Sequence, residues 1–252
     1  MVKKNKKKNC ALLIIGNEIL SGRTQDKNIS FLALWLNTNL GIKIDEVRVI
    51  PDVEKKIIKS VLDLSNKYNY VLTTGGIGPT HDDITAKSIS KAFKKKYTYN
   101  IEAFNILKKY YGNEFDDPRK KMAKMPSGSK LIYNPSSAAP GFMIKNVICL
   151  PGVPLILKSM VHNLKKYLSP GVKIFSSSVR CQTVESKIAK EVGAIQKKHN
   201  KFVEIGSYPF FRLGKIGVSI VMRSSKKYNL QSCHKDIINF IKSKKIKIYK
   251  GM

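Results

Sequence analysis

Acidic residues are scarce in this sequence. The chain has 17 Asp and Glu against 47 Lys and Arg, which gives a formal net charge of +30 at pH 7. A strongly basic surface attracts nucleic acid, anionic lipid and acidic metabolites alike, and it specifies none of them. Lysine and asparagine runs recur along the whole chain, as a biased genomic composition would also produce. Charge alone therefore identifies no partner.

Closely spaced cysteines are absent as well. The four cysteines are far apart and form no Cys-x-x-Cys pair: Cys10, Cys149, Cys181 and Cys233. This spacing supports neither a zinc site nor a disulfide framework, and it fits a reducing compartment. We therefore expect a cytoplasmic protein.

Long apolar runs are the third absence. No run approaches the ~18 residues of a membrane span, so we expect no membrane partner. Lys residues precede the apolar run Ala11–Ile15, as in an export signal, but this run is shorter than the ~7 to 15 residues that such a signal needs. The sequence instead predicts a basic tail over residues 1–9 that leads into a buried strand.

What is present is an alternation of apolar runs and helical periodicity. Hydrophobic residues make up 42% of the sequence, which is enough for a packed core. The pattern predicts strands over residues 11–15, 43–50, 70–74 and 146–150. It predicts helices over residues 27–39, 52–64, 84–93 and 153–167, with a further helical passage that reaches Tyr111. Alternation of this kind indicates an α/β fold with a doubly wound, mostly parallel sheet.

A domain boundary is predicted at Ser169-Pro170-Gly171. We expect one domain over residues 10–169 and a small α+β module over residues 170–252. Residues 171–252 hold 18 basic and 4 acidic residues, whereas residues 1–170 hold 29 and 13. The predicted module is therefore the more basic part of the chain per residue.

Carboxylates gather in the loops that follow the predicted strands: Glu18, Asp26, Asp52, Asp82 and Asp83. In open parallel sheets, ligands bind outside the carboxyl ends of the strands. The loop after the third strand also contains three glycines, whose backbone amides can receive a phosphate. A divalent cation held by the carboxylates would bridge to that phosphate and screen the repulsion between the two.

Simpler roles stay open at the same positions. Asp52 and Asp83 each precede a predicted helix, so each can be an N-cap, a role worth about 1 kcal/mol. Gly75, Gly76 and Gly78 can serve only to turn a strand into a helix. The loop lacks the third glycine of a dinucleotide-binding fingerprint, and no Walker sequence occurs in the chain.

Several linked motifs resemble a known family. GNEILSGRTQDKN, TTGGIGPTHDDIT, NPSSAAPGF and LPGVP occur in the order and spacing of the molybdopterin-binding, MoaB/Mog-like domain. Their form is similar to the domain that opens the competence/damage-inducible CinA proteins and to its counterpart in eukaryotic FAD synthases. IGSYPFF and GVSIVMRSS resemble the small KH-like module that follows this domain in CinA. The resemblance covers residues 10–225, and neither the CinA amidase domain nor the adenylyltransferase domain of FAD synthases has a counterpart in this sequence.

The resemblance also implies roles for individual residues. Asp52 and Asp83 match two aspartates implicated in adenylyl chemistry, so we expect them to be catalytic. We expect Glu18, Asp82 and Asp83 to hold the metal. The expected substrate- and phosphate-binding residues are Gly16, Ser21, Gly22, Thr74, Gly75, Gly76, Gly78, Ser137, Gly141, Pro151 and Gly152. Asn17 is a departure, because the family usually has Asp there.

In function, the resemblance implies a metal-dependent pyrophosphatase that acts on ADP-ribose-like or flavin dinucleotides. Mg²⁺ or a similar divalent metal would be its cofactor, and a homo-oligomer, dimer or trimer, is expected. The alternative is molybdopterin binding or adenylyl transfer in molybdenum cofactor synthesis. Nucleic-acid binding by the module is a third hypothesis. Its GxxG candidate, Gly214–Gly217, lies in a predicted strand connection, whereas a KH reader places this loop between helices, so we expect only weak, non-specific binding.

Overall fold

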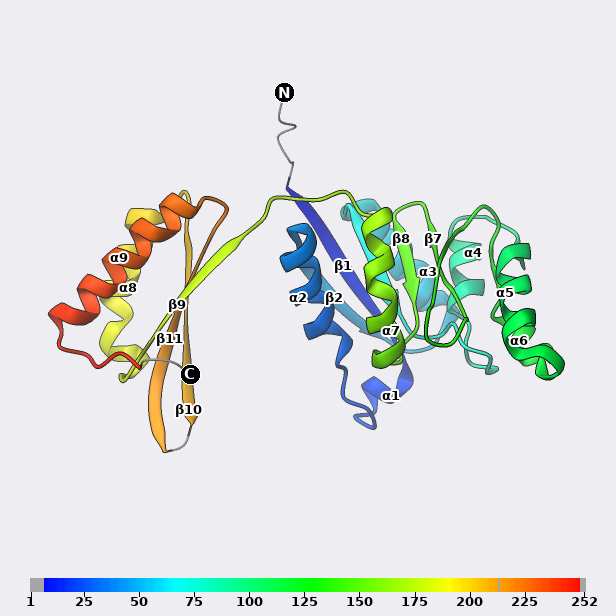
Figure 1. Ribbon diagram of the computed structural model, residues 1–252, viewed down its shortest axis with the longest axis horizontal. Coiled ribbons are helices and arrows are strands. Elements are labelled where there is room, and N and C mark those ends of the chain that lie inside the picture. The colour runs from blue at the N-terminus through cyan, green and yellow to red at the C-terminus, as the bar shows by residue number, and fades with distance from the viewer. Residues whose placement is uncertain (1–6, 213, 250–252) are drawn as a thin grey trace, which may run out of the picture. The chain divides into compact units, whose positions relative to one another are not determined.

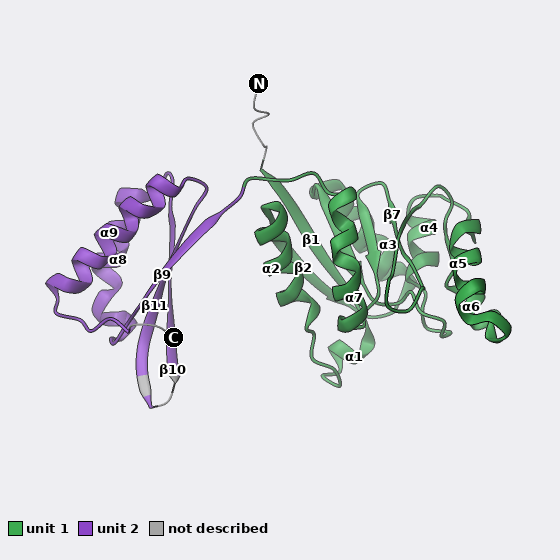
Figure 2. Cartoon of the chain, in the orientation of Figure 1, with its two compact units in different colours: residues 1–172 green, residues 173–252 purple. Residues whose placement is uncertain are grey.

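The structure, a computed structural model, describes residues 7–212 and 214–249. The chain divides into two compact units, residues 1–172 and residues 173–252 (Figure 2). Most of the predicted basic tail, residues 1–6, lies outside the described residues. Its last part is not a tail, because the first strand begins at Lys8. No helix in the described part of the chain is long and apolar enough to cross a membrane.

A mostly parallel sheet forms the centre of unit 1, as predicted (Figure 1). Among the described residues its strand order is β2-β1-β3-β8-β7-β6. The parallel strands are β1 (Lys8–Ile15), β2 (Ile42–Ile50), β3 (Tyr70–Thr74) and β8 (Val147–Leu150). The antiparallel edge consists of β7 (Gly141–Ile144) and β6 (Lys130–Ile132), which the sequence pattern did not predict.

Helices cover both faces of this sheet, which makes the fold doubly wound (Figure 1). One face packs against α2 (Asn28–Leu40), α7 (Pro154–Met160) and the 3₁₀ helix η2 (Val161–Lys166). The other packs against α3 (Glu54–Lys67), α4 (Thr85–Ala92) and α5 (Ile101–Tyr111). Side chains alternate along each strand. In β3, Val71 therefore joins the α3/α4 core, whereas Leu72 joins the α2/α7 core.

The strand order fixes where a crevice opens. From β1 the chain passes to β2 on one side, and it then returns to place β3 on the other side of β1. The connections after β1 and β3 therefore leave toward opposite faces, and such a switch point is where open α/β sheets bind ligands. The segment after β1 contains the four-residue helix α1 (Asn17–Leu20), and the segment after β3 contains the three glycines.

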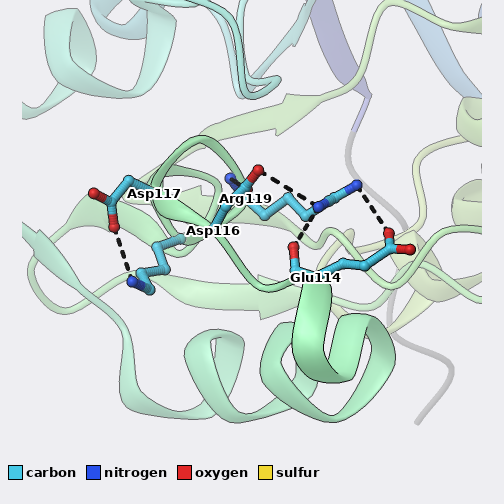
Figure 3. A network of polar contacts seen from close by, with 5 residues as sticks. Glu114, Asp116, Asp117 and Arg119 are labelled. Carbon is cyan, nitrogen blue, oxygen red and sulfur yellow. Dashed lines mark hydrogen bonds and ion pairs between the residues drawn. The ribbon is translucent and has the colours of Figure 1, made fainter.

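A small subdomain precedes β6. It comprises β4 (Tyr97–Tyr99), the 3₁₀ helix η1 (Gly112–Glu114), α6 (Asp117–Lys121) and β5 (Lys124–Pro126), and β4 pairs with β5. Figure 3 shows the ion pairs of α6: Arg119 bonds Glu114 and Asp116, and Lys120 bonds Asp117. Asp116 also caps the helix by accepting from the Arg119 backbone N–H at 3.1 Å. These contacts fix a one-turn helix whose last residue is Lys121.

One predicted helix is shorter than expected. The sequence predicts a helix over residues 153–167, but α7 ends at Met160 and the chain continues as 3₁₀ helix η2 to Lys166. Pro154 occupies the first turn of α7, where its missing N–H costs nothing.

Unit 2 is the predicted small α+β module. Its described strands form an antiparallel sheet in the order β10-β11-β9, with β9 (Phe175–Cys181), β10 (Glu204–Arg212) and β11 (Lys215–Ser224). Helices α8 (Glu185–His199) and α9 (Lys227–Ser243) share a core with these strands. Gly214–Gly217 connects β10 to β11 and continues into β11. The GxxG pattern therefore lies in a strand connection, and two helices do not flank it.

A charged cluster joins the two helices of unit 2. Asp236 accepts hydrogen bonds from Lys198 Nζ and His199 Nε2, both at 2.8 Å. Lys198 first, and then His199, holds the pKa of Asp236 below its usual value. A pKa that is lowered by folding gives stability above the unfolded pKa of about 4, and this stability is lost as the pH falls through the folded value.

We therefore predict that Asp236→Asn lowers the free energy of unfolding near neutral pH. The difference from wild type should shrink as the pH falls below about 4, because the unfolded wild-type chain then binds a proton at Asp236 before the folded chain does. Urea unfolding of the full chain, with amide exchange read in α8 and α9, measures this. Asp117→Asn is the control, since Asp117 is 91% exposed and its pair with Lys120 should contribute little. Equal effects of the two substitutions would contradict the prediction.

Candidate functional site

The glycine loop after β3 lies tightly against its neighbours. Gly75 has φ 100° and Gly76 has φ 68°, a backbone region that favours glycine. A Cβ on Gly75 would lie 2.1 Å from the Ile15 carbonyl oxygen, and a Cβ on Gly76 would lie 2.1 Å from Thr85 Oγ1. Both glycines are thus required by the fold itself, whether or not the loop receives a phosphate.

Thr80 gathers the two acidic side chains that follow this loop. Its backbone N–H donates to Asp83 Oδ2 at 2.8 Å. Its hydroxyl lies 2.5 Å from both Asp82 Oδ1 and Asp83 Oδ2. A hydroxyl has one proton to donate, so one of the two carboxylates is left without it. Thr80 Oγ1, Asp82 Oδ1 and Asp83 Oδ2 are thus close together, and only one of the two carboxylates receives the hydroxyl proton. Oxygen atoms grouped in this way are the ligands that hard cations prefer.

The capping alternative is wrong for Asp83. The N-cap of α4 is Ile84, and no side chain accepts a bond from the first turn of that helix. Asp83 is instead held back toward Thr80, with its Oδ2 only 2.7 Å from where a Cβ on Gly78 would lie. Gly78 therefore leaves room for the Asp83 carboxylate.

Asp52 also lies before its predicted helix and does not cap it. Helix α3 begins at Glu54 with Val53 as its N-cap, and no side chain caps it. Asp52 Oδ2 accepts from the backbone N–H of Asn17 at 2.9 Å, which ties the loop after β2 to the loop after β1. The Asn17 position, where the family usually has Asp, thus contributes its backbone to the site.

The pKa of Asp52 is raised. Burial is the largest cause, the Asn17 N–H opposes it, and the negative charges of Glu18 and Asp82 add to it. Asp52 consequently feels carboxylates from two other loops. Three of the predicted acidic residues therefore share one electrostatic environment, as expected from their places at the ends of parallel strands.

In the loop after β1, the side chain of Glu18 packs against Gly16. The carboxylate of Glu18 lies against Gly16, where an added Cβ would come within 2.5 Å of Glu18 Oε1. The Ser21 hydroxyl donates to the Glu18 carbonyl at 3.2 Å, and Gly22 follows with φ 73° and open space around it. Both residues form the turn that ends α1. Asp26, the remaining loop carboxylate, accepts from the Ile29 N–H at 2.8 Å in the first turn of α2.

The Ser-rich loop before β7 is organised by Asn134, a residue that the sequence reasoning missed. Asn134 Oδ1 accepts from the backbone N–H groups of Ser136 and Ser137, and its Nδ2 donates to Ser137 Oγ at 2.8 Å and Ala139 O at 2.9 Å. Ser137 is thereby fixed, with its hydroxyl proton still available to a ligand. Gly141 is a packing glycine, since its Cβ would lie 2.4 Å from the Cys149 carbonyl oxygen.

The loop after β8 meets the glycine loop directly. A Cβ on Gly152 would lie 3.4 Å from Gly75 Cα. Asn28, the first residue of α2, donates from Nδ2 to the Gly152 carbonyl at 2.7 Å. The predicted residues Pro151 and Gly152 therefore lie at the same edge of the sheet as Gly75, and Asn28 is a second residue that sequence reasoning missed.

The side chain of Lys121 lies near Asp82 and Asp83. Lys121, at the end of α6, donates from Nζ to the Thr80 carbonyl. The lysine also lines a small pocket beside Asp83, together with Ile77, Gly78, Ala86, Tyr97, Met122, Lys124, Pro140 and Phe142. Hydrogen bonding by Thr80 chiefly, with a smaller effect of Lys121, lowers the pKa of Asp82. No sequence signal marked Lys121 among so many lysines; only the fold places it here.

A bound metal would need ligands beyond the protein. The described residues contain no group of three His, Cys, Asp or Glu side chains close enough to hold an ion together. The predicted set of Glu18, Asp82 and Asp83 is thus not gathered as one cluster. Mg²⁺ is typically held by one or two carboxylates, waters and substrate phosphates, and the oxygens of Asp82, Asp83 and Thr80 suit that mode.

Known proteins resemble this chain in sequence and in fold. Residues 11–170 match the family described as "Probable molybdopterin binding domain", and residues 173–250 match "FAD synthase, middle domain". A protein of Archaeoglobus fulgidus is 34% identical over 198 residues, covering 79% of this chain and 84% of that one. A CinA-like protein of Chloroherpeton thalassium is 29% identical, and the match covers 94% of this chain but only 59% of that protein.

A solved structure agrees with these matches. CinA from Thermoplasma acidophilum, a protein of unknown function, is 31% identical with a TM-score of 0.60, and the match covers 64% of this chain and 98% of that one. The doubly wound sheet with its glycine loop at the switch point therefore defines a molybdopterin-binding-type domain. The chain belongs to the molybdopterin-binding domain family, with CinA-like proteins among its relatives.

We predict that Gly76→Ala lowers the free energy of unfolding by more than about 1 kcal/mol. The added Cβ would clash with Thr85 Oγ1, and this clash adds to the cost of a positive φ. Gly128→Ala is the matched control. Gly128 has φ 80°, but its Cβ would have nothing within 4 Å. Denaturant unfolding of both variants isolates the contact. If Gly76→Ala costs no more than Gly128→Ala, the contact with Thr85 is not what makes Gly76 necessary.

Proposed function

We propose that this chain is a metal-dependent pyrophosphatase that hydrolyses ADP-ribose-like or flavin dinucleotides. The observation that supports this most is the meeting of two acidic loops at the switch point. Asp52 is tied to the loop after β1, and Asp82 and Asp83 are gathered by Thr80 beside the glycines. The match of residues 173–250 to the middle domain of FAD synthase adds support for a flavin or adenine nucleotide as substrate.

The proposed reaction is the addition of water across a phosphoanhydride. The water oxygen forms a new bond to one phosphorus while the bridging P–O bond breaks, which yields two phosphomonoesters. Asp52 is the proposed proton acceptor, because burial raises its pKa and so makes it a better base than an exposed carboxylate. The proton that the water loses passes to Asp52 and then to solvent.

The remaining residues bind and orient the substrate. The proposed phosphate donors are the hydroxyl of Ser137 and the backbone amides of the glycine loop after Gly75, whose own N–H already donates to the Leu150 carbonyl. A divalent cation held by Asp82, Asp83 and Thr80 would polarise the phosphoryl oxygens and neutralise charge as the anhydride breaks. Lys121 would stabilise the same charge from the α6 side, since it already reaches the Thr80 carbonyl.

Molybdopterin binding or adenylyl transfer is the second candidate. The family that matches residues 11–170 is described as a probable molybdopterin binding domain, and this description favours a pterin phosphate in the same crevice. Adenylyl transfer makes or breaks a phosphoanhydride too, so one set of carboxylates serves either reaction.

One assay separates the two candidates. The protein is incubated with ADP-ribose, with FAD, and with ATP plus molybdopterin, each with and without Mg²⁺, and the nucleotide products are read by chromatography. We expect AMP from ADP-ribose or from FAD when Mg²⁺ is present, and no AMP when Mg²⁺ is left out. Pyrophosphate and adenylylated molybdopterin as the sole products would favour the second candidate, and no product at all would contradict both.

We predict that Asp83→Asn reduces turnover at least about 100-fold while the protein stays folded. Asparagine keeps an oxygen that can accept from the Thr80 N–H but loses the charge that holds a cation. Steady-state hydrolysis and thermal unfolding measure the two effects. Asp116→Asn is the control, because Asp116 caps α6 and does not contact Thr80. Full activity in a folded Asp83→Asn protein would remove Asp83 from the mechanism.

A further inference from the structure

One face of the unit 2 sheet has no helix of that unit packed on it. Both helices, α8 and α9, lie on the same side of the sheet (Figure 1). The side chains of β11 that join them in the core are every second residue, Val218, Ile220 and Met222. Because strand side chains alternate, the residues between these three point to the other side. We call that side the open face.

Two aromatic side chains lie on the open face. The sheet register pairs Tyr208 with Ser219 and Phe210 with Gly217, and Ser219 and Gly217 are alternate residues of β11 on this side. The Phe210 ring covers Gly217, because a Cβ on Gly217 would lie 2.6 Å from the ring Cζ. The Tyr208 ring leans over Gly206 in the same way, with its Cε2 at 2.9 Å from such a Cβ. Tyr208 nevertheless stays 47% exposed.

Arginine side chains accompany these rings. Arg223 donates from Nη1 to the Tyr208 hydroxyl at 3.3 Å, and its guanidinium lies 5.9 Å from the ring centroid. A row across the three strands runs from Tyr208 through Ser219 to Arg180. Neighbouring strands are about 4.8 Å apart, so the two ends of this row are roughly 10 Å apart. The open face thus has an aromatic ring on one edge strand and a guanidinium on the other.

The segment after α9 extends the open face. Ile248 forms a bridge to Cys181 and packs against the core, so the flanking Lys247 and Tyr249 point to the open side. The ring centroid of Tyr249 lies 5.8 Å from that of Phe210. A third ring and another basic side chain therefore lie beside the first two rings.

The negative charge of unit 2 lies mostly elsewhere. This unit has 18 basic and 4 acidic residues. Three of the acidic residues, Glu185, Glu191 and Asp236, belong to α8 and α9 on the covered side of the sheet. The fourth, Glu204, begins β10 and lies opposite Arg223 in the register. The open face therefore has a surplus of positive charge.

Exposed rings and positive charge together suit single-stranded nucleic acid. Every base has a flat face that stacks on an aromatic ring, while basic side chains attract the phosphates. A duplex keeps its base faces stacked on one another, so it offers only its charge to these rings. A second copy of unit 2 would bring the same positive charge to the open face, which opposes its pairing there.

We propose that the open face of unit 2 binds single-stranded nucleic acid. Bases stack on Tyr208 and Phe210, Arg223 holds the Tyr208 ring in place, and Arg180 and Lys247 attract the phosphates. Stacking does not distinguish one base from another, so the binding is not sequence-specific. This activity goes beyond the proposed hydrolysis, because it needs none of the acidic loops of unit 1. It also needs no GxxG loop.

Fluorescence anisotropy of labelled oligo(dT), titrated with the full chain at near-physiological salt, tests the proposal. Tyr208→Ala should weaken binding at least about fivefold, since one base–aromatic stack contributes that much or more. Tyr208→Phe should keep most of the affinity, because the ring remains. Binding to a DNA duplex of the same length should be equal in wild type and Tyr208→Ala, since only charge contributes there.

Tyr228→Ala is the matched control. Tyr228 is 80% exposed, but it lies in the first turn of α9, on the covered side of the sheet. This variant should bind oligo(dT) as tightly as wild type. If Tyr208→Ala binds equally tightly, or if the wild type binds no oligo(dT), the proposal is wrong. It is also wrong if sedimentation shows that Tyr208→Ala breaks up an oligomer while its affinity for oligo(dT) is unchanged, because the open face is then an interface between copies.

Discussion

The loop after β3 can lie against the end of β1 only because Gly75 carries no side chain. A Cβ there would lie 2.1 Å from the carbonyl oxygen of Ile15, and on the β8 side the Gly75 N–H donates to the Leu150 carbonyl at 3.1 Å. Three strand ends thus close on one another through backbone alone. This closeness puts the loops after β1, β3 and β8 within reach of a single small ligand. The positions of the candidate residues in these three loops depend on it.

A few charged side chains lie near that contact. The chain is poor in carboxylates, yet Asp52, Asp82 and Asp83 lie in two loops at the same edge of the sheet, where the charge of Asp82 acts on Asp52. Burial raises the pKa of Asp52, and this effect is larger than the opposing effect of the backbone N–H that Asp52 accepts from. Lys121 bonds the Thr80 carbonyl, so it approaches the acidic pair without neutralising it through a direct ion pair. These properties favour a site that is completed by a phosphate and a divalent cation.

The sequence predicted most of the parallel core and only part of the site. Strand β3 was predicted with its observed bounds, because a short apolar run between turn residues leaves little choice. Strands β6 and β7 were missed, since each has only three or four residues and little pattern. The acidic loop residues were predictable from their places after strands. Lys121 and Asn28 were not, because their roles arise from tertiary contacts that no local pattern encodes.

The central claim is that a cation and a nucleotide phosphate meet between the loops after β1, β2 and β3. Paramagnetic broadening by Mn²⁺ in the presence of ADP, read on backbone amide signals, tests it most directly. The account predicts that residues 16–18, 52 and 75–83 broaden first, and that Asn69 and Asn146, which lie next to the amino ends of β3 and β8, stay sharp. Broadening centred away from these loops, or broadening that ADP does not strengthen, would contradict the account.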